Sequence, residues 1–157
     1  MQTDNTETAA IGTSTLLRRI LKTSNLRSFL DQNAASMTVP TFVAYLDRLC
    51  SERNMVREHV ILRAGIDRGF GHQLFRGSRK PSRDNVLRLA IGFGLDVDET
   101  QELLRAARRT QLYPRYKRDA AIIYGLSHHN TIIEIQSSLS EMGMTLLGGE
   151  RHEHTER

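Results

Sequence analysis

Two stretches of the chain are rich in arginine and lysine and contain no acidic residue. The first, from Arg68 to Arg83, holds five basic side chains, and the second, from Arg105 to Arg118, holds six. Runs of like charge are commonly solvated faces. Phosphate groups are the partner that such clusters would neutralise, because released counterions supply affinity for any polyanion. Two interpretations stay open on charge alone, a solvated surface and a nucleic-acid surface.

No arrangement typical of catalysis accompanies the two clusters. The residues offer no Ser-His-Asp, Cys-His or paired-carboxylate constellation. The single cysteine, Cys50, excludes an internal disulfide and a cysteine-rich metal site. Four of the six histidines lie close together in sequence, the neighbours His128 and His129 and the pair His152 and His154, and they depart from the H-E-x-x-H zinc pattern. We therefore expect no enzyme activity, no cofactor and no metal site.

The composition is that of an ordinary globular protein. The chain has 157 residues, of which 39% are hydrophobic and 25% are charged, with a net charge of +4. This length suits one domain with some additional elements. No run of about 18 apolar residues exists, and the first residues lack a basic start followed by an apolar stretch. We expect neither a membrane span nor a signal peptide, and a cytoplasmic location in a bacterial cell.

Helical periodicity runs through most of the sequence. Apolar residues recur at spacings of three and four, while alternation typical of strands is absent. Helix starts and stops fit the same pattern, because Ser, Thr and Asp cap helix N-termini and glycine commonly ends helices. The sequence thus predicts an all-α protein. The expected caps are Ser82, Asp96 with Glu99, and Thr131 with Glu134, and the expected stops are Gly65, Gly94 and Gly143.

A pair of short helices joined by "AGID" has the layout of a helix-turn-helix. Residues 42 to 104 resemble the XRE family of phage repressor and Cro-like domains. The likeness is carried by "LRAGID" at the turn, "LFRGSRKPS" after the third helix, and "LRLAIGFGLDVDET" in the fourth and fifth. The string "GIDRGFGHQLFRGSRKPSRD" is similar to a group of XRE-like proteins with helical flanks on both sides. The resemblance implies a lambda-repressor-like five-helix bundle with helical N-terminal and C-terminal extensions.

The expected domain organisation follows from this resemblance. A disordered N-terminus and a disordered tail enclose a helical N-terminal flank, an XRE-like helix-turn-helix domain and a C-terminal helical hairpin. No internal repeat is recognised in the sequence. The boundaries are residues 1–13 for the N-terminus, 14–37 for the flank, 38–109 for the domain, 110–147 for the hairpin and 148–157 for the tail.

The resemblance implies a sequence-specific transcriptional regulator whose partner is double-stranded DNA. In XRE domains the third helix, here about residues 67–76, lies in the major groove. Arginine offers two matched contacts to guanine, and glutamine two to adenine. The loop after this helix would bind phosphates, which position the protein. The implied base-reading residues are Arg68, Gly69, His72 and Gln73, and the implied phosphate-binding residues are Arg57, Arg76, Ser78, Arg79 and Lys80.

The sequence departs from the family at two places. Gly71 stands where XRE domains bury an aliphatic side chain, and we expect Phe70 or His72 to fill that space. Each glycine costs a helix interior about 1 kcal/mol relative to alanine, so the third helix is intrinsically weak. Cys50 and Phe75 stand where the family often has a buried arginine–glutamate pair. Replacing both partners together avoids stranding a buried charge.

A second function remains open beside DNA binding. A bundle with a weakened third helix and large flanks also suits a protein-interaction adaptor or an antitoxin-like partner-binding bundle, because fold alone does not determine function. The hairpin at 110–147 is apolar enough to form a homodimer, or else it folds back on its own domain. Its apolar residues are Ile122, Ile123, Leu126, Ile132, Ile133, Ile135 and Leu139.

Overall fold

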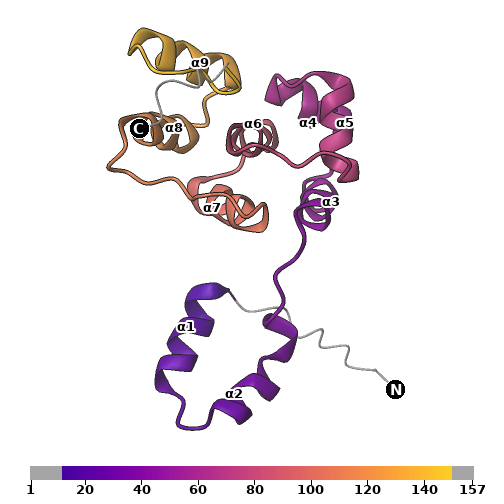
Figure 1. Ribbon diagram of the computed structural model, residues 1–157, viewed down its shortest axis with the longest axis vertical. Helices are drawn as coiled ribbons and strands as arrows, with labels where there is room; N and C mark the ends of the chain where they lie inside the picture. Colours follow the sequence, from indigo (N-terminus) through magenta and orange to yellow (C-terminus); the bar gives the residue numbers. More distant parts are fainter. Residues whose placement is uncertain (1–11, 150–157) are drawn as a thin grey trace. The chain divides into compact units, whose positions relative to one another are not determined.

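The computed structural model describes residues 12–149, and every regular element in that part of the chain is a helix. This confirms the all-α prediction. The chain divides between Val39 and Pro40 into two compact units, which are considered separately (Figure 1). Most of the stretches predicted to be disordered, 1–11 and 150–157, lie outside the described residues.

The N-terminal unit contains α1 (Thr13–Lys22), α2 (Leu26–Gln32) and a short 3-10 turn (Ala34–Ser36). Asn25 starts α2 by accepting a hydrogen bond from Ser28 N, and Arg19 Nη1 donates to Asn33 Oδ1 at 2.9 Å. Phe29 is the one large apolar side chain of these elements that is buried. Most apolar side chains of the unit are exposed: Leu17, Ile20, Leu21, Leu26, Leu30, Met37 and Val39.

The second unit begins with five helices around a shared core. They are α3 (Phe42–Arg53), α4 (Arg57–Ala64), α5 (Arg68–Arg76), α6 (Arg83–Phe93) and α7 (Val97–Ala106). The core consists of fully buried aliphatic and aromatic side chains from all five helices, among them Leu46, Val60, Leu74, Phe75, Leu87, Phe93 and Leu103. Burial of such side chains is the main source of stability in a domain of this size.

The predicted caps of α4, α6 and α7 are confirmed in this unit. Ser82 Oγ accepts from Asn85 N at 3.2 Å at the start of α6. Asp96 and Glu99 form a reciprocal capping box at the start of α7. Gly65 and Gly94 end α4 and α6 in the left-handed conformation, with φ of 65° and 70°. The local sequence signals therefore set these boundaries.

Two further helices, α8 (Lys117–Ser127) and α9 (Ile132–Glu141), pack against each other and join the same core. Ile122, Leu126, Ile135 and Leu139 are all buried there. Gly125 lets the two helices approach closely, because a β-carbon on it would lie 2.5 Å from Ile135 Cγ1. The C-terminal hairpin thus folds back on its own domain.

The α6–α7 and α8–α9 hairpins repeat one another at a constant separation of 35 residues, from Arg83 to Arg118 and from Gln101 to Gln136. Each hairpin ends in a glutamine clasp: Gln101 makes two hydrogen bonds with the backbone of Leu112, and Gln136 makes the same two with Leu147. The identical pairs are Arg83/Arg118, Asp84/Asp119, Glu99/Glu134, Gln101/Gln136, Leu104/Leu139, Thr110/Thr145 and Leu112/Leu147.

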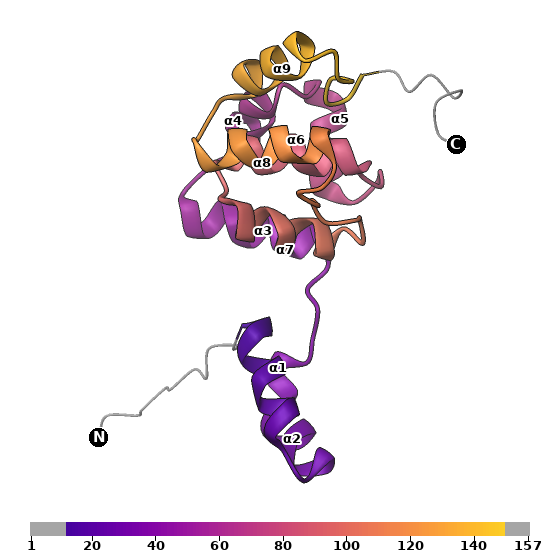
Figure 2. The same ribbon diagram turned by 90° about the vertical axis from the view of Figure 1, so that its left-hand side faces the viewer.

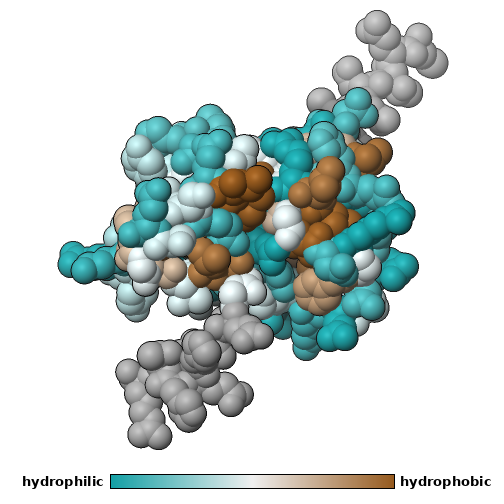
Figure 3. Space-filling view, turned by 90° about the horizontal axis from the view of Figure 1, so that it is seen from above, coloured by the Kyte–Doolittle hydropathy of each residue, from teal (hydrophilic) through white to brown (hydrophobic). Residues whose placement is uncertain are grey.

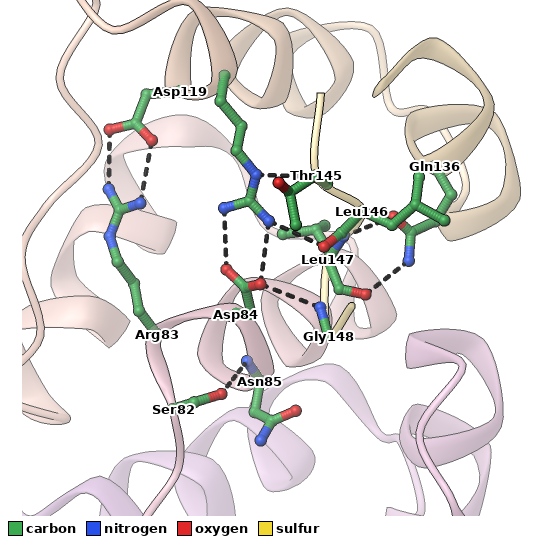
Figure 4. A network of polar contacts seen from close by, with 11 residues as sticks. Ser82, Arg83, Asp84, Asn85, Asp119, Gln136, Thr145, Leu146, Leu147 and Gly148 are labelled. Carbon is green, nitrogen blue, oxygen red and sulfur yellow. Dashed lines mark hydrogen bonds and ion pairs between the residues drawn. The ribbon is translucent and has the colours of Figure 1, made fainter. Parts of the chain in front are cut away.

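Reciprocal ion pairs join the two hairpins (Figure 4). Arg83 forms two hydrogen bonds with Asp119, at 3.0 and 2.8 Å, and Arg118 forms two with Asp84, at 3.0 and 2.9 Å. The side chain of each arginine also donates to carbonyls after its own hairpin, at Thr110 and Gln111 or at Thr145 and Leu146. Both guanidiniums are thereby satisfied in a mostly buried setting.

This reciprocity is the pattern expected around a two-fold axis, where residue i of one half meets residue j of the other and the reverse contact also occurs. In both ribbon views α7 and α9 lie on opposite sides of the α6–α8 pair (Figures 1 and 2). The expectation of no internal repeat is therefore wrong. The repeat escapes notice in the sequence because the identical residues are mostly the polar ones that form the clasps and ion pairs.

Candidate nucleic-acid interface

The α5 helix has one buried side and one outward side. It starts where the Asp67 carboxylate accepts from Phe70 N at 3.0 Å, and it ends at Gly77, whose φ is 79°. Its buried residues are Gly71, Leu74 and Phe75. The four predicted base-reading residues lie on the remaining side, with Arg68 and Gly69 exposed and His72 and Gln73 half-buried.

Gly71 is explained by close packing between α4 and α5. A β-carbon at this position would lie 2.6 Å from Ile61 Cγ2 and 2.7 Å from Ile61 Cγ1, which no real side chain tolerates. The Ile61 side chain of α4 therefore occupies the space that an aliphatic residue at position 71 would fill. The expectation that Phe70 or His72 fills it is wrong. The side chain that fills this space comes from α4, so the sequence pattern of α5 alone cannot predict it.

Gly69 differs from Gly71 because nothing packs closely against it. The nearest atom to a β-carbon at this position would be Asp67 Oδ2, at 3.4 Å, which is an ordinary contact. Packing inside the protein therefore does not require a glycine here. The residue leaves bare backbone at the exposed start of α5, where a ligand can approach closely.

Glu58 of α4 contacts two of the outward residues of α5. Its Oε1 accepts from Arg68 Nη2 at 2.5 Å and from Arg68 Nε at 3.2 Å, and it lies 3.5 Å from His72 Nε2. Hydrogen bonding from Arg68 lowers the pKa of the Glu58 carboxyl below its ordinary value. The ionised carboxylate holds the Arg68 side chain across the turn. Sequence analysis did not single out Glu58.

The predicted phosphate-binding residues fall into two groups. Arg76, Arg79 and Lys80 are exposed and have no carboxylate within ion-pair distance among the described residues. Arg57 and Ser78 have partners within the protein. Arg57 pairs with Asp47 at 2.9 Å, and the Ser78 hydroxyl donates to Gln73 O at 3.3 Å.

Arg57 also lies over the ring of Phe75, with 5.6 Å between the guanidinium carbon and the ring centroid. Phe75 is fully buried, whereas Cys50 is half-buried and belongs to the edge of the same core. Burial raises the pKa of the Cys50 thiol, and the nearby Arg57 charge opposes that rise. Both positions are apolar, so neither leaves a buried charge without a partner.

Much of the second basic cluster is structural. Arg118 pairs with Asp84, Arg109 Nε donates to Pro81 O at 3.0 Å, and Arg105 pairs with Glu102 at 3.0 Å. Arg83 of the first cluster pairs with Asp119 in the same way. Arg83, Arg109 and Arg118 thus join parts of the repeat, Arg105 is paired on the surface of α7, and none of the four can be counted as a free cation. The signal that could have revealed them is the dipeptide Arg-Asp, which recurs at the start of both α6 and α8.

No family model, curated protein or solved structure matches the chain. The resemblance to XRE domains therefore rests on the residues quoted above. No helix within residues 12–149 is long and apolar enough to cross a membrane. The same residues contain no group of three or more His, Cys, Asp and Glu side chains arranged to hold a metal ion, and His152 and His154 lie beyond them.

Proposed function

We propose that the chain is a sequence-specific DNA-binding protein, a bacterial transcriptional regulator that inserts α5 into the major groove. One observation carries the proposal. The outward side of α5 presents Arg68, Gly69, His72 and Gln73. Its last residue, Arg76, and the loop residues Arg79 and Lys80 then present cations with no ion-pair partner among residues 12–149. Side chains able to contact bases are thus followed by side chains able to bind phosphates, the order that a recognition helix requires.

The helix arrangement supports the same proposal. The α4 and α5 helices are joined by Gly65, Ile66 and Asp67, the compact turn of a helix-turn-helix. In this interpretation α3 to α7 are the five helices of a lambda-repressor-like bundle, and α8–α9 is an extension that repeats the last two. Such a protein would be cytoplasmic and associated with the nucleoid when bound to DNA.

Residues 110–147 expose less apolar surface for a dimer contact than the sequence suggested. Four of the seven apolar residues, Ile122, Leu126, Ile135 and Leu139, are buried within the chain's own core. Ile133 remains exposed on α9, and Leu62 is exposed on α4. Hydrophobic patches lie among polar side chains on the face seen from above (Figure 3). A homodimer would therefore use the outer surface of α9.

The adaptor hypothesis is favoured by a different observation, the exposed apolar side chains of the N-terminal unit. Leu21 and Val39 are 75% and 73% exposed, and α1 has no buried residue. Helices as short as α1 and α2 are marginal alone in water, so this surface suits a protein partner. A regulator with a protein partner would use both surfaces, whereas an adaptor would use this one and bind DNA without sequence preference.

A randomised-library selection with the full chain tests the proposal. We expect enrichment of a defined sequence that binds about a thousandfold tighter than random DNA at the same salt concentration. Binding to all sequences with equal affinity would reject sequence-specific regulation and leave the adaptor hypothesis. The ratio must be measured at two salt concentrations, because the phosphate contribution depends steeply on salt.

A further inference from the structure

The two-fold relation between the hairpins exposes a difference between them. On the α6–α7 hairpin, Val86, Leu89 and Leu103 are fully buried. Their equivalents on α8–α9 are Ala121, Tyr124 and Ser138, which line an open groove of about 530 Å³. The same surface is thus covered in the first repeat and open in the second. Figure 2 shows α8 and α9 with no other described helix in front of them.

Two helices, α3 and α5, contact the end of α6 beside this surface in the first repeat. Arg53 at the end of α3 donates to Glu99 Oε2 at 2.5 Å and to Phe93 O at 3.3 Å, so it ties α3 to the junction of α6 and α7. Phe75 of α5 packs on Phe93, with ring centroids 6.3 Å apart. A helix with apolar side chains and a terminal arginine is therefore the shape that fits an α6–α7 hairpin.

The second repeat retains the carboxylate of this contact but not the arginine. Glu134 is equivalent to Glu99, and His128 is equivalent to Phe93. No basic side chain of the described residues pairs with Glu134, whose carboxylate contacts the Thr131 hydroxyl at 3.3 Å. Glu134 lies one turn before Ser138 on α9, at the end of the groove, whereas the charged residues in the lining itself are Lys117 and Glu141, which are opposite in charge. Glu134 is therefore the carboxylate that a cation from outside would complete.

The groove also presents large side chains that carry exposed apolar surface. Tyr124 is 60% exposed and Met142 is 52% exposed, and the Tyr124 ring stacks on His128 with centroids 4.0 Å apart. Aromatic and methionine side chains are the types that recur where proteins bind amphipathic helices. The shape of the groove, its apolar lining and the nearby Glu134 carboxylate together indicate a partner helix with apolar side chains and a basic residue.

We propose that the α8–α9 groove binds one amphipathic helix of a partner protein, whose apolar side packs on Ala121 and Tyr124 and whose arginine or lysine pairs with Glu134. The site is separate from α5 and does not depend on DNA binding. The partner helix would contact the second repeat as α3 contacts the first.

The test uses the full chain as the target of a displayed library of helix-forming peptides about four turns long, ~15 residues. We expect the selected peptides to have apolar residues at spacings of three and four and a basic residue near the C-terminal end. A synthetic copy of the best peptide should perturb backbone amide NMR signals of α8 and α9, and not those of α5. Peptides without this pattern, or signals that move elsewhere, would overturn the proposal.

Three variants sharpen the test. Ala121→Arg places a charged side chain in the groove and should weaken the selected peptide about tenfold or more. Glu134→Gln should weaken it about threefold to tenfold at low salt and less at high salt, because a charge pair is lost. Ile133→Arg is the matched control on the outward side of α9, and it should have no effect. Equal loss for Ile133→Arg and Ala121→Arg would contradict binding in the groove.

The chain itself provides two competing occupants, which the same assay separates. A peptide of residues 13–22 that binds the groove as tightly as the selected peptides would identify α1 as the occupant and overturn a separate partner. A dimer in sedimentation that Ala121→Arg dissociates would identify a second copy and overturn it equally. We expect neither outcome: α1 carries Arg18, Arg19 and Lys22, but its ten residues make a shorter helix than the twelve of α3, which contacts the first repeat.

Discussion

The Ile61 side chain occupies the space beside Gly71, where a β-carbon would lie 2.6 Å from Ile61 Cγ2. This contact sets the distance between α4 and α5 and thereby the pose of the outward side of α5. A glycine that weakens the helix is therefore required by the packing of its neighbour. Gly69, two residues earlier, has no such contact, and the two glycines consequently have different roles.

Alanine substitutions at the two glycines should change the free energy of unfolding in opposite directions. Gly71→Ala gains about 1 kcal/mol of helix propensity but overpacks the core, which costs about 1 to 3 kcal/mol, so it should destabilise the protein. Gly69→Ala should stabilise it by up to about 1 kcal/mol, because its β-carbon meets no close atom. Urea unfolding measures both. Stabilisation by Gly71→Ala would show that Ile61 moves aside without cost.

The reciprocal ion pairs should contribute strongly to stability. Asp119→Ala leaves Arg83 without its carboxylate, and the two side chains are only 7% and 19% exposed in the pair. Removing one partner of a largely buried pair costs about 3 kcal/mol. Glu52→Ala is the control, since it breaks the exposed Arg48–Glu52 pair and should cost less than about 1 kcal/mol. If Asp119→Ala and Glu52→Ala change the midpoint of thermal unfolding equally, the Arg83–Asp119 pair contributes little to stability.

Helix boundaries are the part of the fold that the sequence predicts well. Ser82, Asp96 with Glu99, Gly65 and Gly94 act where expected, because caps depend on residues within one turn. The capping box predicted for Thr131 and Glu134 is only partly formed. Its hydroxyl accepts from Glu134 N, but the Glu134 carboxylate returns to that hydroxyl and not to the backbone of Thr131.

Contacts between distant segments are the part that the sequence does not predict. The arginines at 83 and 118 look like free cations in the sequence, because the aspartates that pair with them lie more than 30 residues away. Arg57 is another case, since its partner Asp47 belongs to the preceding helix. Charge clusters therefore overestimate the free positive surface. Of the five predicted phosphate-binding residues, Arg76, Arg79 and Lys80 have no ion-pair partner within residues 12–149.

Substitutions on α5 and in the loop after it should affect DNA binding in different ways. Arg68→Ala should weaken the selected sequence by about 1 to 3 kcal/mol and relax the preference at one base pair, because a bidentate contact is lost. Arg79→Ala should weaken all sequences alike and reduce the salt slope by about 1, because one phosphate contact is lost. Gel-shift titrations at several salt concentrations measure both. Identical effects of the two variants would contradict base contact by Arg68.

Glu58 should limit non-specific binding by the same surface. Its carboxylate is ionised at neutral pH, partly neutralises Arg68 and would repel nearby phosphates. Glu58→Gln should therefore raise the affinity for random DNA about threefold to tenfold at low salt and lower the ratio of selected to random affinity. Glu52→Gln removes the same charge from an exposed pair on α3 and is the matched control. If the control raises random-sequence affinity as much as Glu58→Gln does, net charge alone explains the change, and the contact between Glu58 and Arg68 has no part in discrimination.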